Sequence, residues 1–205
     1  VEDQEDIRQY LAHHIRENFR VLEAGNGEQG YHLAVENIPD LVVTDLIMPR
    51  MDGLEMCGKL KEDLHTSHIP VVMLTAKADL SDRLEGIGTG ADAYLTKPFN
   101  IREVLLVIQK MIEQRKKLRE RFSKNVKLEP KDIAITSADE KFLSRAMAVI
   151  ENHLGDSGFD VNLFQKEMAM SRMQLFRKIK ALTDQAPGDF IRIIRLKRAA
   201  RLIEE

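Results

Sequence analysis

The chain has 205 residues, with 31 Lys+Arg against 33 Asp+Glu, 43% hydrophobic and 31% charged residues. This composition is typical of globular proteins and excludes both a disordered chain and one with a membrane-spanning run of about 18 apolar residues. The single cysteine, Cys57, cannot form an internal disulfide, and charge begins at Glu2 without a signal-peptide pattern. A cytoplasmic protein of one large or two small domains is therefore expected.

The net charge of −2 conceals an uneven distribution along the chain. Residues 1–113 carry 11 basic and 20 acidic side chains, a net of −9. Residues 114–136 carry 8 against 3, a net of +5, and residues 137–205 carry 12 against 10, a net of +2. Within the last segment, residues 165–201 hold 10 basic and 3 acidic side chains. Such asymmetry indicates that the C-terminal half faces nucleic acid.

The first half alternates short apolar runs with amphipathic segments. The pattern predicts helices over 6–18, 28–37, 54–64 and 80–88, and a long helix from Ile101. It predicts strands at Val1, 19–24, 41–44, 71–75 and 93–96. Buried strands that alternate with helices indicate an α/β fold with a parallel sheet covered on both faces. In such sheets the ligand site lies beyond the carboxyl ends of the strands.

Polar side chains stand at these strand ends: Glu2, Asp3, Asp45, Thr75 and Lys97. Three converging carboxylates repel each other, so a bound cation is expected between them. Their hard oxygen atoms are ligands that Mg²⁺ prefers. A hydroxyl and an ammonium group suit phosphate oxygens, so the set fits phosphoryl transfer with Asp45 as nucleophile. Any one of these residues alone is more often a helix cap or a loop residue. Their coincidence at four strand ends favours the functional interpretation.

Four segments carry a resemblance to the receiver domain of two-component response regulators: 1–3 (VED), 43–53 (VTDLIMPRMDG), 74–76 (LTA) and 97–99 (KPF). Residues 1–113 resemble this family throughout, which implies a flavodoxin-like, five-stranded parallel sheet of order 2-1-3-4-5. Most of the family's first strand is missing before Val1, and a free receiver that starts there is expected to be unstable.

The resemblance also implies roles for individual residues. Asp45 would accept a phosphoryl group from a histidine kinase, in the same chain or a separate one. Mg²⁺ would be bound by Asp3, Asp45 and the carbonyl of Ile47, with Glu2 assisting. Lys97 would contact the phosphoryl group, and Thr75 and Tyr94 would form the switch pair.

The helix from Ile101 has a heptad-like seam formed by Val104, Ile108, Met111, Arg115, Leu118 and Phe122. One interpretation is an amphipathic helix that packs on its own domain. The other is a short coiled coil that pairs two subunits, although Arg115 weakens it and the seam covers only about three heptads. Residues 114–136 are expected to form a basic linker, and residues 123–137 are expected to be a non-helical connector broken by Pro130.

The second half is predicted to be all-α. A helix over 139–154 would place Phe142, Ala146, Val149 and Ile150 inward. Asp160 would cap a helix that runs to about Met168, and Ser171 would cap another that runs to about Leu182. Two short helices joined by a tight turn suggest a helix-turn-helix.

On a wheel of about 100° per residue, Leu175, Ile179 and Leu182 share one face of the helix after Ser171. The opposite side, with the neighbouring Arg172, presents Met173, Phe176, Arg177 and Lys180. Such a cationic, partly apolar face suits the DNA major groove, where Arg reads guanine, apolar groups touch thymine methyls and Lys meets phosphate. A solvated basic helix is the alternative.

Residues 137–205 resemble the first part of an AraC/XylS-type DNA-binding domain, on segments 171–183 (SRMQLFRKIKALT), Pro187, 190–192 (FIR) and 195–200 (RLKRAA). Ala169 replaces the glycine usual in the family's turn, and Gln165 replaces a small residue between the two helices. The family has two helix-turn-helix units, and Glu205 comes before the second. The part present is therefore expected to bind DNA weakly or not at all in isolation.

These features together predict a phosphorylation-controlled transcription regulator without enzymatic turnover that binds double-stranded DNA. The order of its parts resembles the output end of hybrid two-component proteins, and a free-standing response regulator is the alternative. Two further classes remain open: a phospho-aspartyl phosphatase-like enzyme, and a receiver adaptor whose basic helix binds protein.

Overall fold

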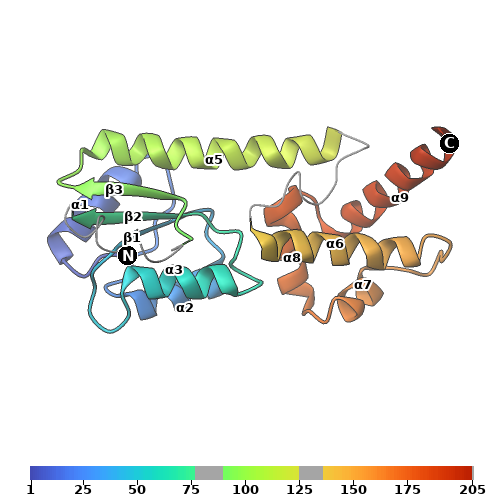
Figure 1. Ribbon diagram of the computed structural model, residues 1–205, viewed down its shortest axis with the longest axis horizontal. Coiled ribbons are helices and arrows are strands. Elements are labelled where there is room, and N and C mark those ends of the chain that lie inside the picture. Colours follow the sequence, from blue (N-terminus) through green and yellow to red (C-terminus); the bar gives the residue numbers. More distant parts are fainter. Residues whose placement is uncertain (77–89, 125–135, 205) are drawn as a thin grey trace. The chain divides into compact units, whose positions relative to one another are not determined.

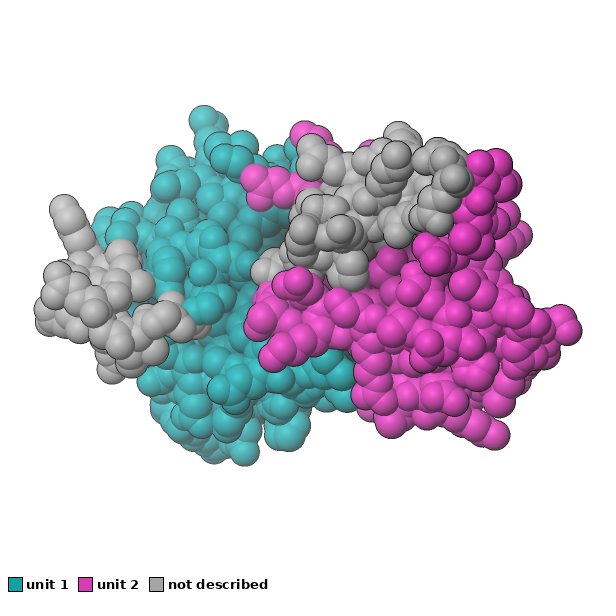
Figure 2. All heavy atoms as spheres, turned by 45° about the vertical axis from the view of Figure 1, so that its right-hand side comes forward, with its two compact units in different colours: residues 1–113 teal, residues 114–205 magenta. Residues whose placement is uncertain are grey.

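The computed structural model describes residues 1–76, 90–124 and 136–204. The chain divides into two compact units, residues 1–113 and 114–205, which Figure 2 colours separately. The predicted helix over 80–88 and residues 125–135 of the expected connector, including Pro130, lie outside the described residues. At residues 123, 124 and 137 the expectation of a non-helical connector is wrong, because these residues belong to helices. Each helix that the structure describes is too short or too polar to cross a membrane.

Unit 1 contains a parallel sheet of β1 (Val42–Asp45), β2 (Val71–Ala76) and β3 (Ala93–Lys97), which lie side by side in this order. In the register, Asp45 pairs with Leu74 and Ala76 pairs with Lys97. The last residues of all three strands therefore lie at one edge of the sheet, as the sequence predicts.

Helices cover both faces of this sheet (Figure 1). α1 (Glu5–Ile15) and α5 (Ile101–Lys124) lie on one side, and α2 (Gly27–Asn37) and α3 (Gly53–Glu62) on the other. The alternation of β2 explains why, because successive side chains of a strand point to opposite faces. One core contains Val72 and Leu74 with side chains of α1 and α5, and the other contains Val71 and Met73 with those of α2 and α3. The predicted α/β fold with a parallel sheet is confirmed.

Two of the five expected strands are not formed as strands in the described residues. Val1 and Glu2 nevertheless lie between two extended segments. The nitrogen of Val1 donates to the Val43 carbonyl at 2.6 Å, and the N–H of Glu2 donates to the Ala24 carbonyl at 3.1 Å. These contacts favour the order 2-1-3-4-5, but a two-residue ladder is too short to form a strand, and the full order stays a prediction.

α5 is one helix that begins in unit 1 and belongs to unit 2 from Gln114 onward. Val104 and Ile108, the first two seam residues, are fully buried in the core beneath α5, and Met111 is partly buried beside them. This part of the seam packs on its own unit. The side chains of Leu118 and Phe122 lie outside the described part, so subunit pairing stays a prediction.

Besides the end of α5, the described part of unit 2 contains α6 (Ser137–Asn152), α7 (Val161–Glu167), α8 (Arg172–Thr183) and α9 (Pro187–Glu204) around one apolar core. Phe164 and Phe190 are fully buried and stack with ring centroids 6.3 Å apart. Of the residues predicted to face inward from α6, Phe142, Ala146 and Ile150 are buried, whereas Val149 is only half-buried, and Leu143 is fully buried. The inward stripe therefore keeps three of its four expected residues, with Leu143 in place of Val149 as the fourth.

Candidate functional site

Asp45 ends β1 at the carboxyl edge of the sheet, where its side chain is buried. Its Oδ1 accepts a hydrogen bond from the backbone N–H of Leu46 at 2.8 Å. Gly53 approaches from α3, donating its N–H to the Leu46 carbonyl at 2.9 Å. A Cβ at Gly53 would lie 2.1 Å from the Asp45 carbonyl oxygen. The missing side chain of Gly53 thus lets α3 start directly against the backbone of Asp45.

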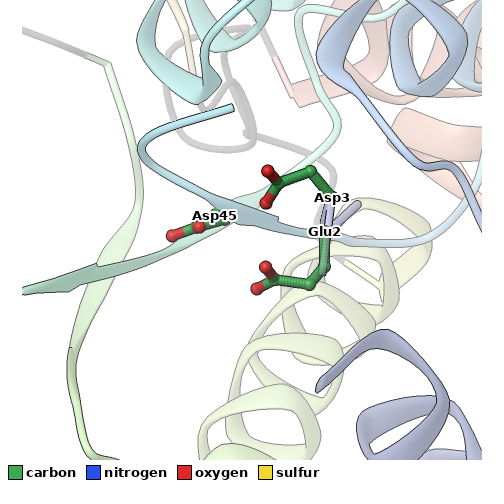
Figure 3. Close-up of side chains that lie close together, drawn as sticks. All are labelled: Glu2, Asp3 and Asp45. Carbon is green, nitrogen blue, oxygen red and sulfur yellow. The ribbon is translucent and has the colours of Figure 1, made fainter. Parts of the chain in front are cut away.

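Glu2 and Asp3 reach the same place from the start of the chain. The N–H of Asp45 donates to the Val1 carbonyl at 2.9 Å, and Arg8 Nη1 donates to the Glu2 carbonyl at 2.8 Å. One carboxylate oxygen each of Glu2, Asp3 and Asp45 lies within 4.8 Å of the others (Figure 3). Glu2 is buried and Asp3 is exposed, so the cluster is open to solvent on the Asp3 side.

Lys97, the last residue of β3, joins two of these carboxylates. Its Nζ lies 3.0 Å from Glu2 Oε2 and 3.0 Å from Asp45 Oδ2. Burial raises the pKa of Glu2 above its usual 4.5, the negative charge of Asp45 adds to this, and the hydrogen bond from Lys97 opposes it. Burial alone would lower the pKa of Lys97, but the hydrogen bonds to Asp45 and Glu2 outweigh this effect and raise it. Lys97 is therefore held in its charged form.

The donor set fits a small divalent cation. The three carboxylates Glu2, Asp3 and Asp45 face one ammonium group, that of Lys97, so negative charge is in excess at this cluster. Mg²⁺ prefers hard oxygen ligands, usually one or two carboxylates with waters and phosphate oxygens. The open side at Asp3 leaves room for such further ligands.

The other expected receiver residues have different surroundings. Thr75 is 1% exposed at the same sheet edge, and its hydroxyl donates to the Ala76 carbonyl at 3.1 Å. Tyr94 is half-buried against the core cluster that contains Met73, its partner in the register. The side chain of Ile47 is exposed. Contacts thus bring together Glu2, Asp3, Asp45 and Lys97, while the switch role of Thr75 and Tyr94 and the carbonyl ligand of Ile47 stay predictions.

In unit 2, α8 separates its side chains as the helical wheel predicts. Leu175, Ile179 and Leu182 are at most 3% exposed. Met173 and Phe176 are 59% and 43% exposed, which is unusual for large apolar side chains in a folded unit. Among the predicted cations of this surface, Arg172 and Lys180 are exposed and Arg177 is half-buried.

The turn before α8 has the geometry that a glycine would favour. Asp160 caps α7 by accepting from the N–H of Leu163 at 2.9 Å, and Ser171 forms a capping box with Gln174, so both predicted caps are confirmed. Ala169 has a φ of 54°, in the left-handed region. A residue with a Cβ is strained there, by about 1–2 kcal/mol. The alanine therefore occupies the backbone conformation of a turn glycine.

Sequence reasoning missed two ion pairs of α8. Lys178 is 1% exposed, and its Nζ lies 2.5 Å from Oδ1 of the equally buried Asp139 of α6. Its place on the wheel beside the apolar face was the available signal. Lys180 lies 2.8 Å from the carboxylate of Asp184, and its i,i+4 spacing was visible in the sequence. Lys180, which the sequence predicts to contact phosphate, is therefore paired with the carboxylate of Asp184 in this structure.

Residues 1–109 match the family of the response regulator receiver domain. The chain belongs to this family. Receiver domains bind Mg²⁺ at an acidic pocket and imply a histidine kinase as partner. In this receiver domain the acidic cluster is that of Glu2, Asp3 and Asp45.

Two relatives cover different parts of the chain. "Histidine kinase P4" of Formosa agariphila is 44% identical over 204 residues, which are all of this chain and 15% of that protein. "Transcriptional regulatory protein SrrA" of Staphylococcus aureus is 41% identical over 115 residues, 56% of this chain and 46% of that protein. The chain thus spans less than half the length of these curated relatives.

Solved receiver domains show the same fold. The signal receiver domain of a signal transduction histidine kinase from Syntrophus aciditrophicus has a TM-score of 0.52 at 29% identity, covering 56% of this chain and 87% of that one. A response regulator receiver domain protein from Clostridium thermocellum has a TM-score of 0.52 at 28% identity, covering 57% and 94%. The flavodoxin-like receiver fold is confirmed.

Proposed function

We propose that this chain is a phosphorylation-controlled, DNA-binding regulator of a two-component system. A histidine kinase transfers a phosphoryl group to Asp45, and the second half of the chain binds double-stranded DNA. The observation that carries the first part is the position of Lys97, whose Nζ lies 3.0 Å from both Glu2 and Asp45 beside the third carboxylate, that of Asp3.

Each residue of the site has a task in this reaction. An oxygen of Asp45 attacks the phosphorus, and the bond from phosphorus to the kinase imidazole breaks. Asp3, Asp45 and the carbonyl of Ile47, with Glu2 assisting, would hold Mg²⁺, and the bound ion would supply positive charge for the phosphoryl oxygens. Lys97 leaves its carboxylate partners to pair with one of these oxygens.

Thr75 and Tyr94 then respond as the switch pair. The hydroxyl of Thr75, which donates to the Ala76 carbonyl, exchanges this acceptor for a phosphoryl oxygen. Tyr94 moves toward the space that Thr75 leaves. The two changes bias the end of β3 and the helix that follows it, α5.

For the second half, we propose domains at 1–113 and 137–205 joined by a basic linker at 114–136, the last domain being of AraC/XylS type. α7, the turn at Ala169 and α8 would form its first helix-turn-helix. Arg172, Met173, Phe176, Arg177 and Lys180 would face the major groove. The surface position of Met173 and Phe176 among cationic side chains supports this assignment.

The relatives support a hybrid protein in which sensor, kinase, receiver and DNA-binding domain form one chain. A protein named as a histidine kinase matches both halves of this chain, and the matched part is 15% of that protein's length. A free-standing regulator is the alternative, since a protein named as a transcriptional regulator matches the receiver half.

The first test is phosphorylation of this chain by acetyl phosphate with Mg²⁺, followed by intact-protein mass spectrometry. We expect the wild type to gain one phosphoryl group and Asp45→Asn to gain none, because the amide of Asn is not a nucleophile toward phosphorus. Asp40→Asn, at an exposed carboxylate outside the cluster, is the matched control and should label normally. Persistent labelling of Asp45→Asn would overturn the assignment.

A further inference from the structure

The last turn of α8 receives a hydrogen bond from α5. The final four carbonyls of a helix have no partner within the helix itself. In α8, the carbonyl of Lys180 accepts from the N–H of Asp184 at 2.9 Å, in the left-handed cap of the helix. The carbonyl of Ala181 accepts from Nε of Arg119 at 2.6 Å. Arg119 of α5 therefore caps α8, the helix proposed to face the major groove, from outside.

Charged residues of α5 also act on the side chain of Asp184 at this end of α8. The hydrogen bond from Lys180 is the main cause that lowers the pKa of Asp184, and the positive charges of Arg119 and Lys116 lower it further. Cations are also favourable beside a helix C-terminus, where the carbonyl ends carry partial negative charge. The positive charges of Arg119 and Lys116 of α5 therefore act on Asp184, the residue that caps α8.

The opposite end of α5 packs in unit 1. Val104 and Ile108 are buried against the sheet that carries Asp45. α5 begins at Ile101, shortly after Lys97, and continues as a helix to Lys124. One helix therefore contains both the residues that pack beneath the acidic site and the residue that caps α8.

We propose that Arg119 is a positioning residue, which fixes the C-terminal turn of α8 and makes it respond to the phosphoryl group on Asp45. This inference rests on the proposed function. When Lys97 leaves Glu2 and Asp45 for the phosphoryl group, the start of α5 shifts, and α5 passes the shift to Arg119 because a helix is stiff along its axis. The Arg119–Ala181 hydrogen bond then differs between the two forms, as allosteric coupling requires.

The test is hydrogen–deuterium exchange of the backbone amides in the last turn of α8, measured on this chain before and after treatment with acetyl phosphate and Mg²⁺. In the wild type we expect phosphorylation to change the exchange rate there about fivefold. Arg119→Ala should exchange faster, by about fivefold, before treatment, and should not respond to it. Arg119→Lys, which keeps the donor and the charge, should restore the response.

Lys117→Ala, at an exposed lysine of the same helix, is the matched control and should behave as the wild type. A normal response in Arg119→Ala would overturn the proposal, as would an unresponsive wild type whose Asp45 is labelled. If Asp45 takes no label, the proposed function fails instead. The capping by Arg119 is then still decided by the rates before treatment, and equal rates in wild type and Arg119→Ala contradict it.

Discussion

Three lysines of this chain show how surroundings decide what one residue type does. Lys97 is partly exposed between two carboxylates, from which an incoming phosphate can draw it. Lys178 is sealed in the core of unit 2 with Asp139. Lys180 lies at the surface, paired with Asp184. A count of basic residues treats the three alike, although only the exposed ones are able to meet a ligand.

The Lys178–Asp139 pair leads to a stability prediction. Lys178→Met should destabilise unit 2 by about 3–5 kcal/mol, because it leaves the carboxylate of Asp139 buried without its ammonium partner. The double variant Lys178→Met/Asp139→Asn should recover most of that loss, since Asn removes the charge. Urea unfolding followed by circular dichroism measures both. Additive losses in the double variant would show that the two charges do not depend on each other.

Met173 and Phe176 lead to a prediction about base reading. Replacing thymine by deoxyuridine removes one methyl group from the major groove, and each lost contact should weaken binding about fourfold. We expect this with a duplex that the full-length protein selects from a random library. The Met173→Ala/Phe176→Ala variant should lose the methyl dependence, while Leu163→Ala, at an exposed apolar residue of α7, should keep it. Equal methyl dependence in all three proteins would contradict the register of α8.

At the scale of elements, Gly53, the first residue of α3, determines how closely this helix approaches Asp45. Asp52 caps α3 by accepting from the N–H of Glu55 at 2.8 Å, and Gly53 follows in contact with the backbone of Asp45. The helix start and the acceptor aspartate therefore form one packed unit. A change at Gly53 has to move either the helix or the aspartate.

The two glycines of α3 allow a matched test of this contact. Gly53→Ala should destabilise unit 1 by about 3 kcal/mol or more and slow the labelling of Asp45, because its Cβ would overlap the Asp45 carbonyl. Gly58→Ala meets no atom within 4 Å and should stabilise the helix by about 0.5–1 kcal/mol. Thermal unfolding and mass spectrometry measure the two effects. Similar melting temperatures for both variants would contradict the close contact.

At the scale of the whole molecule, charge is divided between the halves. The acidic first half contains the carboxylate cluster, and the basic surplus lies in residues 114–136 and on α8 and α9. If DNA is the partner, binding should weaken steeply with salt, because cations that meet phosphates release counterions. A basic helix whose partner is an acidic protein would instead bind duplex DNA only at low salt and without preference for any sequence.

Subunit pairing belongs to the same scale. Val104 and Ile108 are buried within unit 1, so a seam between subunits would begin only at Met111 and would fall short of three heptads. We therefore expect light scattering to give a monomer mass that does not depend on concentration in the untreated protein. A mass that rises with concentration, before or after acetyl phosphate, would establish pairing instead.

The sequence by itself determined the features that depend on neighbouring residues. The strand ending at Asp45, the caps Asp160 and Ser171, and the buried stripe Leu175, Ile179 and Leu182 follow from local periodicity and turn chemistry, and the structure confirms them. Such patterns repeat within a few residues, so they can be read along the chain without knowledge of the fold.

The tertiary structure alone decided the contacts between distant segments. It brought Lys97 to Glu2 and Asp45, buried Lys178 against Asp139, and set Arg119 against the carbonyl of Ala181. These pairs are separated by 39 to 95 residues along the chain. The pairing of Lys97 with Asp45 depends in addition on the strand register. Local propensity does not specify such partners, because they result from the packing of whole helices and strands against each other.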